Sequence, residues 1–206
     1  MTGRFITFEG GDGSGKTTQI ALLHSWLETR GHTVVLTREP GGTELGVELR
    51  NIVMHRTEFI SPRAEALLYA ADRSHHIATL VRPALERGDI VLQDRYLDSS
   101  VAYQGAGRVL DPMEVRDLSL WATEGLMPDL TVLIDVPASV AKARQAQHER
   151  AFDRLEAEGE DFHTRVRESY LELAAAEPHR FLIVDGEKPI EEIHQLIVTR
   201  VSDLVG

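Results

Sequence analysis

The chain has 206 residues, 42% of them hydrophobic, which is enough for one substantial core, so we expect a single domain over residues 1–206. Its net charge of −11 argues against a nucleic-acid partner, because a protein that binds a phosphate backbone needs a positive surface. The absence of cysteine excludes disulfides and thiolate chemistry. No apolar run approaches membrane-spanning length and no signal peptide is recognisable, so we expect a cytoplasmic protein without a membrane partner.

The first predicted strand, residues 5–8, leads into a glycine-rich loop that precedes the first predicted helix. Gly10 to Thr17 fits the pattern G-x-x-x-x-G-K-[ST] in the strand–loop–helix context that the pattern requires. Glycines let the backbone bend around an anion, and the N–H groups at the helix N-terminus point toward it. Lys16 is placed to reach the β- and γ-phosphates of a nucleoside triphosphate, and the Thr17 hydroxyl to bind Mg²⁺. A glycine-rich turn with a chance lysine is the alternative, which the complete match disfavours. We expect nucleotide contacts from Gly10, Gly11, Asp12, Gly13, Ser14, Gly15, Lys16, Thr17 and Thr18.

The rest of the chain alternates between predicted strands and helices. The first helix should end near Gly31, which suits a C-cap. We then expect strands at 33–37, 90–92, 130–135 and 181–184, and helices at 43–54, 61–87, 112–124, 138–147, 155–176 and from Pro189 onward. This alternation, with nearly continuous apolar strands, predicts an α/β fold with a five-stranded parallel sheet and helices on both faces.

Ligands of such folds bind outside the carboxyl ends of the strands. That edge of the predicted sheet should gather the residues that directly follow each strand. They are the phosphate loop, Arg38 and Glu39, Asp94 and Arg95, Asp135, and Asp185 with Gly186. We therefore expect the active site there.

The predicted helix at 61–87 carries an aromatic ring beside an arginine. At 100° per residue, Tyr69 and Arg73 lie together, opposite the expected core stripe. A planar ligand suits this pair, because the ring can stack on it while the guanidinium donates hydrogen bonds. The alternative is an exposed tyrosine beside a solvated arginine. The expected core stripe consists of Leu67, Ala71, Ala78, Val81 and Leu85.

Two further groups of charges have more than one interpretation. Arg50 and Arg95 are placed to hold a second phosphate at the edge of the sheet, or to form structural ion pairs. The charged stretch at 144–161 is either a solvated face or part of the site. The nine histidines show no metal-ligand spacing, so no zinc site is expected.

Residues 92–104 closely resemble the thymidylate kinase signature, D-R-[YFH]-x-x-S with a following A-[FY]-Q. The acidic residue before the phosphate loop and the segments 37–43, 69–73 and 153–156 match that family in order and spacing. The resemblance runs essentially end to end. It implies the P-loop kinase fold with a small lid, and transfer of the γ-phosphoryl group of ATP to dTMP, giving ADP and dTDP for dTTP synthesis. It also implies Mg²⁺ as the cofactor, ATP and dTMP as partners, and a homodimer.

The resemblance assigns the base-binding residues by matching position. Arg73 would hydrogen-bond thymine O4, and Tyr69 would stack on the base, where many relatives have phenylalanine. Ser100 and Gln104 fall where residues near thymine N3 lie, and Tyr103 where a ring disfavours a ribose 2′-hydroxyl.

The acceptor phosphate and sugar are assigned in the same way. Arg50 and Arg95 would hold the phosphate, and Arg38 and Pro40 belong to the same expected dTMP site. Glu9 would approach the sugar 3′-hydroxyl or a metal-bound water, which makes it, with Thr17, an expected metal residue. The peptide bond before Pro40 is a candidate cis bond.

The chain departs from part of the family at one place. Some members carry an arginine inside the phosphate loop, where this chain has Asp12, Gly13 and Ser14. In members without it, arginines of the lid, here about 144–156, supply the charge. We expect Arg150 to be the catalytic lid arginine, because it has the fewest structural duties, and Arg144 to be second, with ATP contacts that also include Asp185 and Gly186.

Three other functions compete with this one. The nearest is a kinase of the same fold that acts on another nucleoside monophosphate. A GTPase needs N-K-x-D to read guanine, but the one asparagine, Asn51, is followed by Ile52. A non-catalytic ATP-binding module is disfavoured by the intact Lys16 and Thr17, together with the acid–arginine pair at 94–95.

Overall fold

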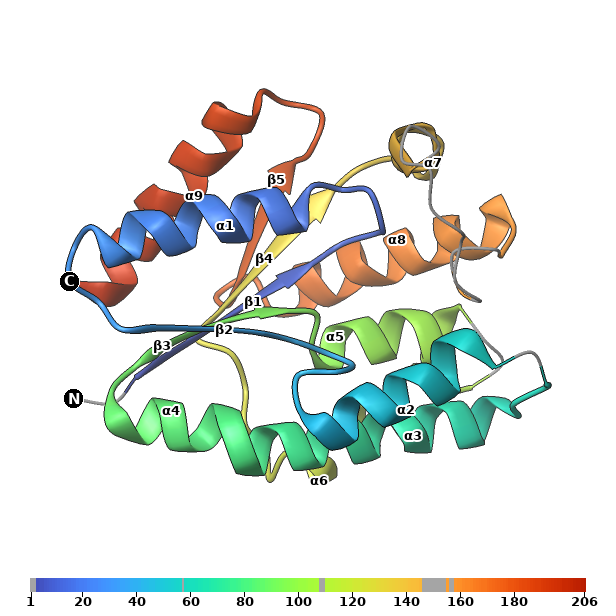
Figure 1. Cartoon of the computed structure of the whole chain (residues 1–206). Helices are drawn as coiled ribbons and strands as arrows, with labels where there is room; N and C mark the ends of the chain where they lie inside the picture. The colour runs from blue at the N-terminus through green and yellow to red at the C-terminus, as the bar shows by residue number, and fades with distance from the viewer. Residues whose placement is uncertain (1–2, 57, 108–109, 146–154, 156–157) are drawn as a thin grey trace.

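The computed structural model describes residues 3–56, 58–107, 110–145, 155 and 158–206. Its strands form one parallel sheet in the order β2-β3-β1-β4-β5, which confirms the expected five-stranded sheet (Figure 1). Because β1 is central, the loop that follows it leaves the sheet between β3 and β4. The strands are β1 (Arg4–Glu9), β2 (Val34–Arg38), β3 (Ile90–Asp94), β4 (Leu130–Asp135) and β5 (Phe181–Asp185).

Helices cover both faces of the sheet (Figure 1). Helices α1 (Lys16–Glu28) and α9 (Ile190–Val205) pack together on one face. The other face carries α2 (Glu44–His55), α3 (Pro62–His76), η1 (Ile77–Val81), α4 (Arg82–Arg87), α5 (Leu97–Ser100), η2 (Val101–Ala106), α6 (Pro112–Ala122) and α8 (Glu160–Ala176), with α7 (Ala138–Gln145) beyond the carboxyl end of β4. Within the described ranges, no helix has the length and apolarity needed to span a bilayer.

Alternate strand residues build separate cores on the two faces. Ile6 and Phe8 of β1 are fully buried with residues of α1 and α9. Phe5, one position away, packs with residues of α4 and α5 on the other side. This is the pattern of a parallel strand that is buried on both faces.

Most predicted elements begin and end within two residues of their observed bounds, but two predictions were incomplete. Helix α8 begins at Glu160 rather than 155, because Gly159 is its N-cap. The helical segment 97–106 (α5 and η2) was not predicted. Almost every residue in that segment is buried, so it shows no alternation of apolar and polar faces from which a helix is recognised.

The expected core stripe of the 61–87 helix was largely wrong. Leu67 is 57% exposed, and Ala71 and Ala78 are also exposed, whereas Val81 is fully buried. The reason is the π-helical segment η1, which divides the helix into α3 and α4. A π turn holds an extra residue, so it shifts the phase of the buried face. The stripe expected for one unbroken helix therefore does not coincide with the buried face of α3.

The turn between α8 and β5 is tied to α5 by a buried ion pair. The guanidinium of Arg180 donates to both oxygens of Asp98, at 2.8 Å each, and to Oγ1 of Thr131 at 2.7 Å. The side chains of Arg180 and Asp98 are 4% and 0% exposed. A buried carboxylate of this kind is stable only with its partner in place.

We predict that Arg180→Leu lowers the free energy of unfolding by about 3–5 kcal/mol, because it leaves Asp98 buried and unpaired. Urea denaturation measures this loss. The matched control is Arg63→Leu, which removes the exposed 3.5 Å pair with Glu114 and should cost less than about 1 kcal/mol. Similar losses in the two variants would contradict a structural role for the buried pair.

Candidate active site

A cavity of about 810 Å³ opens at the carboxyl ends of the strands. It brings together most of the residues expected from the sequence. These are Asp12, Gly13, Ser14, Gly15, Lys16, Thr17, Thr18, Arg38, Pro40, Arg50, Tyr69, Arg73, Arg95, Ser100, Tyr103, Gln104, Arg144 and Gly186. Glu9, Gly10, Gly11 and Asp185 do not line it, and Gly10 and Gly11 face a smaller cavity of about 190 Å³ instead. Arg150 lies outside the described residues.

The phosphate loop has the backbone shape that its glycines allow. Gly10, Gly13 and Gly15 have φ values of 130°, 82° and 105°, a region that other residues rarely adopt. Gly10 also has no room for a Cβ, which would clash with the carbonyl oxygen of Ile134. The side chain of Lys16 folds back over the loop, where its Nζ donates to the carbonyl oxygens of Gly10 at 3.0 Å and Gly11 at 2.9 Å. Burial and the nearby Arg95 lower the pKa of Lys16.

Glu9 lies behind the cavity wall rather than in it. Its side chain is fully buried, and its two oxygens accept three hydrogen bonds, from the backbone N–H of Tyr96 at 2.7 Å and the hydroxyls of Ser99 at 2.6 Å and Tyr170 at 2.9 Å. Glu9 is therefore not placed in the cavity for the expected contact with the sugar or a metal-bound water. Burial and the nearby Asp98 raise the pKa of Glu9 to about 7.

Arg95 stands at the end of β3 with a φ of 67°, an unusual backbone conformation for a residue other than glycine. Its guanidinium donates to the carboxylate of Asp12 at 2.7 Å and to the hydroxyls of Ser99, Tyr170 and Tyr103 at 3.1–3.3 Å. The Asp12–Arg95 pair joins the phosphate loop directly to the other half of the cavity.

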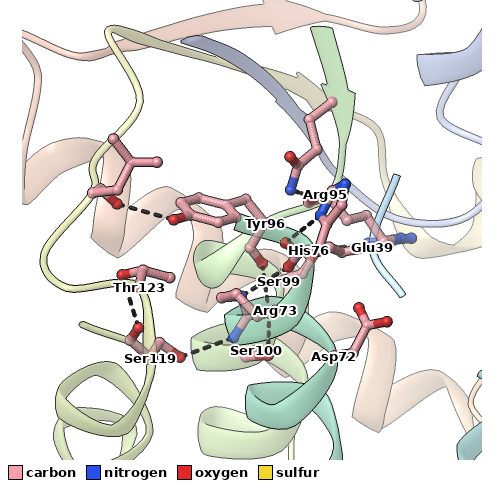
Figure 2. A network of polar contacts seen from close by, with 12 residues as sticks. Glu39, Asp72, Arg73, His76, Arg95, Tyr96, Ser99, Ser100, Ser119 and Thr123 are labelled. Atoms are coloured by element: carbon pink, nitrogen blue, oxygen red, sulfur yellow. Dashed lines mark hydrogen bonds and ion pairs between the residues drawn. The ribbon is translucent and has the colours of Figure 1, made fainter. Parts of the chain in front are cut away.

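Arg73, in that other half, is held by four hydrogen bonds (Figure 2). It is 2% exposed, so the alternative of a solvated arginine is wrong. Its Nε donates to Glu39 at 2.8 Å, its Nη1 to the hydroxyl of Ser119 at 3.1 Å, and its Nη2 to Ser100 at 2.9 Å and to the carbonyl oxygen of Tyr96 at 3.4 Å.

The other expected acceptor residues surround Arg73. Tyr69 is 7% exposed and lines the cavity one turn earlier on α3. The amide of Gln104 donates to Glu65 at 3.0 Å, which fixes its orientation. Arg50 of α2 donates to the carbonyl oxygen of Pro40 at 3.0 Å, and the bond between Glu39 and Pro40 is cis, as expected.

Two oxygen groups in the cavity fit a magnesium ion. Oδ1 of Asp94 is buried and accepts no hydrogen bond from the described residues, and Asp94 lines the cavity together with the exposed Thr17. Within the same residues, no cluster of three acidic or histidine side chains is suited to a metal. A carboxylate with a hydroxyl fits Mg²⁺, which commonly takes one or two protein oxygens and completes its shell with phosphates and water.

Arg144 borders the donor end of the cavity. Its guanidinium donates to the carbonyl oxygen of Gly186 at 2.9 Å and to that of Ser14 at 3.5 Å. It thereby joins α7 to the loop after β5 and to the phosphate loop.

Sequence reasoning missed several residues that build the site. Ser99 and Tyr170 hold Glu9, and Asp94 was noted without a role at the metal. Asp72 and His76 pack beside Arg73, at 1% and 0% exposure. A buried polar residue in an amphipathic pattern resembles a surface residue, so only its position next to a signature residue distinguishes it.

A phosphate loop after the central strand of a parallel sheet, with a second pocket lined by arginines in the same cavity, defines the class of P-loop kinases. Comparison with known proteins identifies the family. The family model for thymidylate kinase matches residues 8–197. A thymidylate kinase of Clavibacter michiganensis subsp. michiganensis is 65% identical over 100% of this chain and 98% of its own length. One of Bifidobacterium longum is 50% identical over 99% of this chain and 100% of its own length.

The comparison of folds agrees. The crystal structure of a thymidylate kinase from Ehrlichia chaffeensis matches with a TM-score of 0.79 and 33% identity, over 98% of this chain and 99% of that one. The chain belongs to the thymidylate kinase family.

The raised pKa of Glu9 predicts a pH-dependent stability. The folded protein holds the Glu9 proton more tightly than the unfolded chain, whose pKa is 4.5, so the stability that Glu9 contributes is complete below about pH 4.5 and is lost as the pH rises through about 7. Glu9→Gln should remove this contribution to the pH dependence of the free energy of unfolding. A pKa shift of this size corresponds to a contribution of at most about 3 kcal/mol. Urea denaturation of the ligand-free protein at pH 5 and pH 8 measures it. The exposed control Glu86→Gln should keep the wild-type slope, and an unchanged slope in Glu9→Gln would show that Glu9 is ionised throughout.

Proposed function

We propose that this protein transfers the γ-phosphoryl group of ATP to dTMP, giving ADP and dTDP. The observation that carries the proposal is the single cavity that joins the phosphate loop to the pocket of Tyr69 and Arg73, with Arg95 between them. An oxygen of the acceptor phosphate attacks the γ-phosphorus while the bond to the ADP oxygen breaks. No side chain forms a covalent bond, so the protein's task is to align the substrates and to neutralise charge.

The donor half binds the triphosphate of ATP. The loop N–H groups surround the phosphates at the positive end of α1, and Lys16 exchanges its two carbonyl partners for phosphate oxygens. Thr17 and Asp94 would hold Mg²⁺, which, when bound, neutralises phosphate charge. Arg144 and Gly186 border the region left for the nucleoside of ATP.

The acceptor half binds dTMP, with Tyr69 against the base and Arg73 at its edge. An arginine carries five N–H donors. Four hydrogen bonds of Arg73 to described residues leave one Nη1 N–H for a ligand. A carbonyl oxygen such as thymine O4 accepts it, whereas the amino group at the same position of cytosine is a donor and leaves it unpaired.

The remaining contacts concern the sugar and the phosphates. Ser100, Tyr103 and Gln104 would contact the base and sugar, and Arg38, Pro40 and Arg50 the acceptor phosphate side. Arg95 would bind the acceptor phosphate once its bond to Asp12 is exchanged. Arg150, with Arg144 second, is proposed as the lid arginine. The lid over about 144–156 within one domain stays a prediction, because 146–154 and 156–157 lie outside the described residues, and so does a cytoplasmic location.

An acceptor panel tests the proposed reaction. Release of ADP from ATP and Mg²⁺ should be fastest with dTMP, slower with dUMP, and slight with UMP, CMP, AMP and GMP. Lys16→Ala should lower kcat about 10²–10³-fold because it removes charge stabilisation. The melting temperature should stay close to wild type, since among the described residues Nζ donates hydrogen bonds only to carbonyl oxygens of the loop.

The panel also separates the rival functions. A preference for another monophosphate would identify a different nucleotide kinase of the same fold. ATP binding without acceptor-dependent ADP release would identify a non-catalytic module. Near-full activity of Lys16→Ala would contradict the role given to the phosphate loop.

We propose in addition that two copies of the chain form a homodimer through α3 and α6. These neighbouring helices carry large apolar side chains that are exposed: Leu67 is 57%, Met113 60% and Trp121 81% exposed. Apolar side chains gathered on adjacent helices are typical of a protein–protein interface.

The dimer proposal predicts the effect of a charge on this surface. Trp121→Glu should shift the protein from dimer to monomer in sedimentation, because burying an unpaired carboxylate at an interface is costly. Leu196→Glu, at a side chain that is 43% exposed on α9, is the control and should stay dimeric. A monomeric wild-type protein would refute the dimer without affecting the proposed reaction.

A further inference from the structure

Helix α3 carries some buried side chains that line the cavity and others that face the segment after β2. Tyr69 and Arg73 line the cavity, whereas Asp72 and His76, which are 1% and 0% exposed, do not. Asp72 and His76 face the segment that follows β2, which we call the acceptor loop, residues 39–42. Figure 2 shows Asp72 and His76 beside Arg73 and Glu39.

Within the described residues, the hydrogen bonds of these two side chains hold the acceptor loop or the strand end before it. Oδ1 of Asp72 accepts the backbone N–H of Gly41 at 3.2 Å. His76 lies with Nδ1 2.9 Å from Oε1 of Glu39 and with Nε2 2.6 Å from the hydroxyl of Thr37. Because a carboxylate only accepts, Nδ1 of His76 is the donor to Glu39.

The acceptor loop in turn connects two arginines of the acceptor half, Arg73 and Arg50. Its first residue, Glu39, pairs with Arg73 at 2.8 Å, and the carbonyl oxygen of its second, Pro40, receives Arg50 of α2 at 3.0 Å. The loop is thus hydrogen-bonded to both guanidinium groups, so its distance from α3 contributes to their separation.

Asp72 also determines how closely α2 approaches. A Cβ on Gly46 of α2 would lie 2.5 Å from Oδ1 of Asp72, so this helix packs directly against the carboxylate. One side chain therefore touches α2 and the acceptor loop and is adjacent in sequence to Arg73.

We propose that Asp72, supported by His76, is a positioning residue for the acceptor: by holding the acceptor loop and α2 against α3, it fixes the distance between Arg73 at the base and Arg50 at the phosphate. This inference rests on the proposed function, because it assigns those two arginines to one bound nucleotide. Asp72 itself does not line the cavity.

The surroundings of Asp72 show which of its two carboxylate oxygens holds the acceptor loop. Oδ2 is buried and has no hydrogen-bond partner among the described residues, so only Oδ1 holds the loop. Burial and the Glu39 carboxylate raise the pKa of Asp72 to about 6, against the opposing effects of the Gly41 N–H, His76 and Arg73. An asparagine presents the same acceptor oxygen without a charge and is therefore a fair substitute.

The test compares two substitutions at this position. Asp72→Ala should raise KM for dTMP about tenfold, the equivalent of one hydrogen bond of about 1.4 kcal/mol, while KM for ATP changes less than about twofold. Asp72→Asn should restore KM for dTMP to within about threefold of wild type. A purely structural residue would not separate the two substrates in this way.

Two further variants keep the test decisive if Asp72→Ala folds poorly. Gly46→Ala places a Cβ 2.5 Å from Oδ1 of Asp72 and 3.2 Å from Cα of Gly41. It therefore disturbs the contact between Asp72 and the acceptor loop without removing the carboxylate, and should raise KM for dTMP selectively. Asp129→Ala is the matched control, because Asp129 also accepts a backbone N–H, from Phe5 at 2.8 Å, but at the opposite end of the sheet. It should lower the melting temperature and leave both KM values unchanged.

Several results would overturn the inference. An unchanged KM for dTMP in Asp72→Ala and Gly46→Ala would show that Asp72 does not position the acceptor. Equal changes in the KM values for dTMP and ATP would show the same. A failure of Asp72→Asn to rescue would show that the charge, rather than the hydrogen bond, matters. Because all ratios are taken against a wild type whose acceptor is established first by the panel, failure here is distinct from failure of the proposed function.

Discussion

The acceptor half of the cavity depends on the burial of one positive charge. A guanidinium at 2% exposure is tolerated only with a counter-charge and enough acceptors, and Arg73 has both in Glu39 and the hydroxyl and carbonyl groups around it. These partners come from α6, from α5 and its N-cap, and from the segment after β2, so the charge fixes elements that are distant in the sequence. The polar inner face of α3 follows from this requirement.

The two halves of the cavity are built by different means. The donor half is mainly backbone: glycines with positive φ and helix N–H groups make an anion site from one continuous segment. The acceptor half is mainly side chain, held by hydrogen bonds between residues far apart in the chain. Arg95 and Asp12 connect the halves across 2.7 Å, so the position of the phosphate loop is linked to that of the acceptor pocket.

This difference between a local donor half and a non-local acceptor half explains which features could be predicted from the sequence. The strands and the phosphate loop are local features, with apolar runs and fixed glycine spacing, and both were found close to their true bounds. The inner face of α3 was assigned to the wrong side because its buried residues are largely polar and because the helix does not keep one α-helical period through 77–81. The resemblance placed Glu9 at the sugar or a metal-bound water by matching position. Ser99 and Tyr170, which hold Glu9 outside the cavity, come from segments whose approach no local pattern shows.

The π-helical segment η1 gives one helix two inner faces. Before it, α3 presents polar side chains to the site, and after it, α4 presents the buried Ala84 to the sheet. Removing one residue from 77–81 would restore an even α-helical winding and rotate one half against the other by about 100°. The length of this short segment, more than the identity of its side chains, therefore determines whether α3 can face the site while α4 faces the sheet.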